Sequence, residues 1–61
     1  MEILSEYQTA DGRSILICED ILTCEYVVMS DRQEMCRFYS MGAVFNFLVT
    51  LGKLRLVHGG L

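Results

Sequence analysis

An Asp-Gly pair near the start of the chain separates two segments that have the pattern of β-strands. Residues 3–9 alternate in polarity, and residues 14–18 contain an unbroken apolar run. Asp11 and Gly12 both tolerate a positive φ, which tight two-residue hairpin turns require. The unbroken run is typical of a strand that is buried on both faces or lies at the centre of a sheet. The sequence therefore predicts an antiparallel hairpin over its first third.

Two further strand patterns follow. A β-branched and aromatic segment spans roughly residues 23–29, and residues 34–39 alternate in polarity after a polar turn at 31–33. The connection at residues 19–22 lacks good turn chemistry, and a single helical turn is the alternative there. Together with the first hairpin, these segments predict an antiparallel meander of about four strands.

One amphipathic helix is predicted over residues 41–51. Ser40 stands where a capping side chain is expected, and Gly52 stands where a left-handed C-terminal cap is expected. Phe47 and Val49 lie off the main apolar stripe; either they are exposed, or the helix buries a wide face. The stripe itself has helical spacing and consists of Met41, Val44, Phe45, Leu48 and Leu51.

The remaining segment completes a small α+β fold. Residues 53–57 alternate for long enough to form a short last strand or an extended tail, and Gly59-Gly60 is expected to fray. A chain of 61 residues hides only about 60% of the surface of its unfolded state. Residues 1–61 are therefore expected to form one domain with one core.

The apolar content exceeds what so short a chain can bury. Hydrophobic residues make up 52% of the sequence, and a chain of this size must leave part of them at the surface. Exposed apolar area on a small protein most often marks an interface, and a second copy is the simplest cover for it. The expected state is a homodimer.

Charge is divided unevenly along the chain. Residues 1–36 hold all eight acids and only Arg13 and Arg32, which gives −6, whereas the rest holds Arg37, Lys53 and Arg55 without an acid, which gives +3. Opposite charges on the two halves can attract within the fold or between subunits, and chance in a short chain is the alternative.

Three cysteines and one histidine are the strongest candidates for reactive or metal-binding groups. Cys18, Cys24 and Cys36 contain no CxxC pair, and their odd number argues against a disulfide scaffold and favours a reducing cytoplasm. They fall in apolar segments predicted as strands, where cysteine acts as a small hydrophobic residue. His58 lies beside a glycine-rich terminus, which would hold a catalytic base in position poorly. We expect no enzyme activity, metal or cofactor.

Other site classes lack their usual patterns. Glu19, Asp20 and Glu25 show no calcium-loop spacing and are predicted to form a solvated turn. No glycine-rich phosphate loop is present. The start of the chain has no signal-peptide pattern, and the longest apolar stretch, near residues 41–51, is too short to span a bilayer. We expect neither secretion nor membrane insertion.

Four segments carry a resemblance to a known class of proteins. SILICED at 14–20, EYVVMSD at 25–31, RFYS at 37–40 and LGKLRL at 51–56 resemble small phage or prophage-encoded proteins of uncharacterised function. The resemblance implies a strand meander followed by a short helix. It also implies a role as an inhibitor that binds and blocks or redirects a host protein. It assigns no functional residue.

These observations predict a non-enzymatic protein-protein interaction module. Aromatic anchors and arginines dominate interface energetics, and the residues expected to make contact are Tyr26, Arg37, Phe38, Tyr39, Phe47 and Arg55. The alternative is a nucleic-acid-binding regulator. It would use the basic C-terminal section for phosphates and Phe38 and Tyr39 for stacking. A metal-bound or redox module ranks third.

Overall fold

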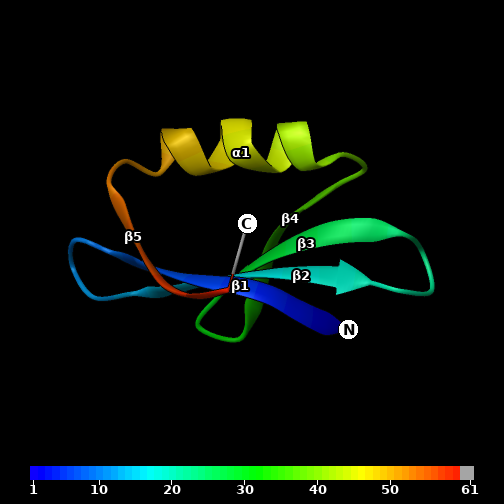
Figure 1. The fold of residues 1–61 in the computed structure, drawn as a ribbon, viewed down its shortest axis with the longest axis horizontal. Helices are drawn as coiled ribbons and strands as arrows, with labels where there is room; N and C mark the ends of the chain where they lie inside the picture. The colour runs from blue at the N-terminus through cyan, green and yellow to red at the C-terminus, as the bar shows by residue number, and fades with distance from the viewer. Residues whose placement is uncertain (60–61) are drawn as a thin grey trace.

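The computed structural model describes residues 1–59 as a five-stranded antiparallel sheet with one helix across one face (Figure 1). The strands lie in the order β4-β3-β2-β1-β5. The α+β meander is therefore confirmed, and the C-terminal segment is a strand. The elements are β1 (Glu2–Thr9), β2 (Ser14–Asp20), β3 (Glu25–Ser30), β4 (Gln33–Phe38), α1 (Met41–Thr50) and β5 (Leu54–Gly59).

The first hairpin turns at Asp11 and Gly12, as predicted. The Thr9 N–H donates to the Arg13 carbonyl over 2.9 Å, and the Gly12 N–H donates to the Thr9 carbonyl over 3.0 Å. Gly12 has a φ of +91°, a backbone conformation that glycine adopts without steric cost. The turn therefore fixes the antiparallel register of β1 on β2.

The β2–β3 turn depends on the side chain of Asp20. Its Oδ1 atom accepts a hydrogen bond from the Leu22 N–H over 3.1 Å, and its carbonyl accepts one from the Cys24 N–H over 2.8 Å. The second bond is helix-like, in line with the alternative prediction for this connection. Cys24 has a φ of +60° and is exposed, so the prediction that it lies within a strand is wrong.

The helix has the predicted caps but a different buried stripe. The Ser40 hydroxyl accepts a hydrogen bond from the Ala43 N–H over 3.2 Å, and Gly52 has a φ of +89°. Phe45, predicted to be buried, is 43% exposed. Phe47 instead contacts Phe38 of β4, with ring centroids 5.6 Å apart. Residues two positions apart lie on opposite flanks of a helix, so contact with β4 through Phe47 turns Phe45 away from β4.

The two central strands are buried on both faces. Ile15 and Ile17 of β2 pack with Val28 of β3 beneath Val44 and Leu48 of α1. Cys18 and Val27 are paired in register on the opposite face and are only 2% and 0% exposed. The unbroken apolar run in β2 therefore matches a strand at the centre of the sheet, as the sequence indicated.

The last strand ends in close contact with β1. Gly59 pairs with Ser5 and has a φ of +105°. A Cβ atom at Gly59 would lie 2.5 Å from the Leu4 carbonyl oxygen. The prediction that Gly59 frays is therefore wrong, because only a residue without a side chain allows this approach; Gly60 lies outside the described residues.

Within residues 1–59, no helix combines the length and apolar character needed to cross a membrane.

Replacing Ser5 with alanine is expected to stabilise the protein. Ser5 is fully buried, and its hydroxyl has no hydrogen-bond partner among the described residues. Removing an unsatisfied buried hydroxyl should raise the free energy of unfolding by about 1 kcal/mol, measured by urea denaturation. Ser14→Ala is the matched control, because that hydroxyl donates to Glu6 over 2.9 Å, and it should destabilise. If Ser5→Ala and Ser14→Ala lowered the free energy of unfolding equally, the Ser5 hydroxyl would not be an unsatisfied group.

Replacing Gly59 with alanine is expected to displace β5 from β1. The new Cβ would meet the β1 backbone at a positive φ, and strain of this kind costs about 2 kcal/mol. Gly52→Ala is the control, because Gly52 also has a positive φ but nothing near its Cβ position, and its cost should be about 1 kcal/mol. Amide hydrogen exchange should show lost protection in β5 only for Gly59→Ala.

Candidate interaction surface

Arg37 of β4 is surrounded by carboxylates from three strands. Its Nη1 atom lies 3.1 Å from Asp20 Oδ2 and 3.1 Å from Glu25 Oε1, and its Nε atom lies 2.8 Å from Glu34 Oε2. Hydrogen bonds to Glu34, Asp20 and Glu25 raise the pKa of the Arg37 guanidinium above its usual value. The hydrogen bond from Arg37 lowers the pKa of Asp20. Arg37 is therefore occupied by acids of its own chain.

Arg37 lies on the face of the sheet opposite α1. It is the register partner of Val27, and directly paired residues place their side chains on the same face. Arginine can lay its methylene groups on apolar surface while its charged end remains polar. The Arg37 cluster therefore shares the face that α1 does not cover with the buried residues Val27 and Cys18.

The aromatic residues predicted as contacts mostly pack inward. Tyr26 and Phe38 are register partners on β3 and β4. Together with Phe47 they are partly buried against the core. Tyr39 differs, because it lies just before α1 and is 82% exposed. The structure thus packs Tyr26 and Phe38 of the sheet with Phe47 of α1 against the core and leaves the Tyr39 side chain exposed.

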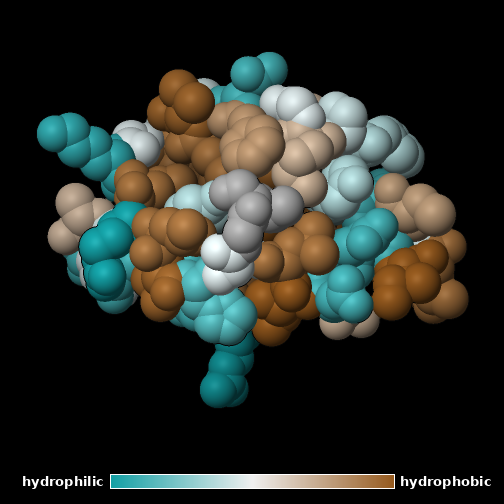
Figure 2. Space-filling view, in the orientation of Figure 1, coloured by the Kyte–Doolittle hydropathy of each residue, from teal (hydrophilic) through white to brown (hydrophobic). Residues whose placement is uncertain are grey.

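An apolar surface lies between α1 and β5, and the sequence had left open the exposure of only one of its residues, Val49. Phe45, Val49 and Leu56 are 43%, 77% and 47% exposed, and we call them the α1–β5 surface. The helix packs against β3 and β4, which leaves the β1–β5 half of that face less covered. Figure 2 shows hydrophobic residues over the C-terminal part of α1 and along β5. Phe45 and Val49 are four positions apart, a spacing that makes two residues neighbours on a helix surface, and this was the sequence signal for the surface.

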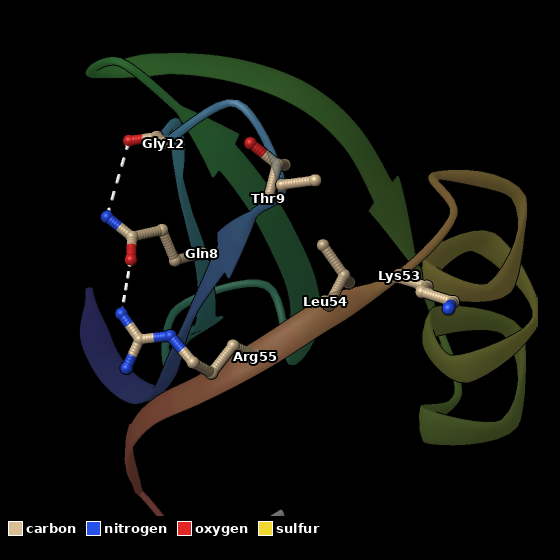
Figure 3. Close-up of a pocket in the computed structure, with 7 residues that line it drawn as sticks. Gln8, Thr9, Gly12, Lys53, Leu54 and Arg55 are labelled. Carbon is tan, nitrogen blue, oxygen red and sulfur yellow. Dashed lines mark hydrogen bonds between the residues drawn. The ribbon is translucent and has the colours of Figure 1, made fainter.

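A hollow of about 360 Å³ lies where the first hairpin meets the start of β5. The Arg55 guanidinium donates to Gln8 Oε1, and Gln8 Nε2 donates to the Gly12 carbonyl over 3.5 Å (Figure 3). Among the described residues, neither Lys53 nor Arg55 forms an ion pair. The rim is therefore basic. The lining residues are Gln8, Thr9, Ala10, Gly12, Lys53, Leu54 and Arg55.

The candidate reactive side chains do not form a cluster. No group of three His, Cys, Asp or Glu side chains in residues 1–59 is placed to hold a metal ion. His58 is exposed on β5 opposite Glu6. Burial raises the pKa of the Cys18 thiol, which disfavours the reactive thiolate. Within residues 1–59, the three cysteines and His58 therefore form no metal-binding group.

Comparison of the chain with known protein families, characterised proteins and solved structures gave no match.

The Arg37 cluster is expected to make stability depend on acid pH. Arg37 lowers the pKa of Asp20 from its ordinary value of 3.8, so the cluster stabilises the fold above that pH, and this contribution is lost as the pH falls through the lower folded-state pKa. Urea midpoints of the parent should therefore fall below about pH 4. Arg37→Gln should be less stable at neutral pH and should show a shallower fall.

Arg32→Gln is the matched control for this measurement. Arg32 is exposed and forms no ion pair among the described residues. The Arg32→Gln variant should show the same dependence of the urea midpoint on pH as the parent. If the urea midpoint of Arg37→Gln fell with pH in parallel with that of the parent, Arg37 would not be responsible for the loss of stability at acid pH. The pKa of Asp11 is lowered chiefly by its hydrogen bond with Thr9, so Asp11 accounts for the fall of stability with pH that remains in Arg37→Gln.

Proposed function

We infer that the protein is a non-enzymatic interaction module that associates with a second copy through its α1–β5 surface. The exposure of Phe45, Val49 and Leu56 is the observation that carries this proposal. Large apolar side chains gathered on a small protein favour association, because their burial removes apolar area from water. No group of three metal-ligating side chains lies among the described residues, so no metal site competes with this proposal.

The position of the surface suits a symmetric contact. Phe45 lies on the flank of α1 opposite the Phe47–Phe38 contact, and β5 is an edge strand of the sheet. Two copies related by a twofold axis would place the same apolar residues against one another, as isologous dimers do. The exposed Tyr39 adds an aromatic anchor through which such a module could engage a further protein in the cytoplasm and inhibit it.

The nucleic-acid alternative has fewer cations available than the sequence indicated. Arg37 is held by three carboxylates, which leaves Lys53 and Arg55 as the basic residues at the start of β5. Two neighbouring cations provide little counterion release, the main source of affinity for phosphate backbones. The structure therefore favours the protein-interaction proposal over this alternative.

Polar substitutions on α1 should weaken self-association. Phe45→Gln together with Val49→Gln removes apolar area from the α1–β5 surface and should raise the dimer dissociation constant by at least about tenfold. Sedimentation equilibrium measures this change, and circular dichroism establishes that the helix is retained. A parent chain that stays monomeric at the highest soluble concentration would overturn the dimer proposal.

Asn46→Ala is the matched control for the helix surface. Asn46 lies between Phe45 and Phe47 on α1 and is exposed, but its side chain contributes little apolar area. It should associate like the parent. Equal weakening by Asn46→Ala would assign the effect to altered helix stability rather than to the α1–β5 surface.

A further inference from the structure

The β2–β3 turn presents two apolar side chains at one end of the molecule. Ile21 is 66% exposed and Leu22 is 95% exposed. Asp20 fixes the turn through the Leu22 and Cys24 N–H groups, and Arg37 in turn holds the Asp20 carboxylate. Figure 2 shows hydrophobic residues at this end of the molecule. A contact already fixed in shape loses little conformational entropy on binding.

Acidic residues surround this turn. Glu2 and Glu19 are register partners on β1 and β2, and Asp20 and Glu25 are register partners beside the turn. Arg37, which pairs with Asp20 and Glu25, is the only basic side chain in this group. Four carboxylates and one guanidinium give a side-chain charge of −3. The turn is thus an apolar tip in a strongly negative field.

The opposite end of β2 leads to the basic hollow. Figure 1 places the first hairpin turn, which lines the hollow, and the β2–β3 turn at opposite ends of the sheet. Ala10 and Leu54 supply apolar lining. Lys53 and Arg55 supply positive charge that no acid among the described residues neutralises through an ion pair. Asp11, between the lining residues Ala10 and Gly12, is paired with Arg13, so Lys53 and Arg55 leave the hollow positive and complementary to the negative turn.

We propose that copies of the protein associate end to end, with the Ile21–Leu22 turn of one copy inserting into the Lys53–Arg55 hollow of the next. The hollow of about 360 Å³ lies within the range of about 300–1,000 Å³ that is typical of binding pockets. Such a contact joins two different surfaces, so it extends into chains where the rotation does not close a ring. It uses none of the three residues of the α1–β5 surface and goes beyond the dimer proposed above.

The test uses a background that lacks the α1–β5 contact. In Phe45→Gln, Val49→Gln protein, a turn variant carries Ile21→Ser and Leu22→Ser, and a hollow variant carries Lys53→Glu and Arg55→Glu. Arg32→Glu is the charge control, because Arg32 lies outside the hollow. Sedimentation velocity measures the mass of each protein alone and of the two variants mixed in equal amounts. Circular dichroism establishes that each variant is folded.

The proposal predicts a specific pattern of masses. The background protein should form species larger than a dimer at high concentration, whereas each variant should associate at least about tenfold more weakly. The mixture should form a one-to-one heterodimer, because one intact turn and one intact hollow remain. Association of the background should weaken from about 0.01 M to about 1 M salt, as the screening length falls from about 30 Å to about 3 Å.

Three results would overturn the end-to-end contact. These are a background protein that stays monomeric, a turn variant that associates like the background, or a mixture without the heterodimer. Binding of the parent to phosphatidylcholine vesicles that is lost in the turn variant would instead assign the turn to a lipid surface. Because the background already lacks the α1–β5 contact, none of these outcomes decides whether the dimer proposed above exists.

Discussion

The fold depends on how a sheet with a single helix stabilises both of its faces. Val44 and Leu48 of α1 cover Ile17 and Val28 on one face. On the other face Arg37 is the register partner of Val27, and three carboxylates hold its guanidinium in place. These ion pairs tie β2, β3 and β4 together on the face that α1 does not cover. That face is not closed, because Ile3, the register partner of Cys18, is 57% exposed.

The same cluster shapes the surface of the molecule. It places charged side chains on β4, and the register shift between Val28 and Met29 adds an irregularity to that edge. Charges and bulges are the usual devices that prevent an edge strand from pairing with another chain. The other edge, β5, also carries a charge, Arg55, and a register shift in its pairing with β1. The two edges differ instead in apolar exposure, because Leu56 and Val57 of β5 are about half-exposed.

The uneven charge of the sequence becomes a spatial polarity in the fold. Acids from β1, β2 and β3 meet at the end that carries the β2–β3 turn, whereas Lys53 and Arg55 lie by the hollow at the other end. Arg37 belongs to the basic part of the sequence but pairs with Asp20 and Glu25 of the acidic part. The attraction expected between the two halves of the chain is thus partly realised within the fold. Lys53 and Arg55 form no ion pair among the described residues.

Local pattern was enough to place most elements, the first hairpin turn and the ends of the helix, because these depend on neighbouring residues. Asp11 and Gly12 lie in the first hairpin turn, Ser40 and Gly52 bound the helix, and the apolar run of β2 marked the centre of the sheet. It did not place Cys24, which lies in the β2–β3 turn, nor did it specify which residues are exposed, because exposure depends on contacts between distant segments. Phe45 and Phe47 could exchange roles until Phe38 of β4 was placed beside one of them. Likewise, Arg37 could serve as a binding residue until strand pairing brought Asp20 and Glu25 to it, beside Glu34 of its own strand, since contacts between distant segments depend on register rather than on local pattern.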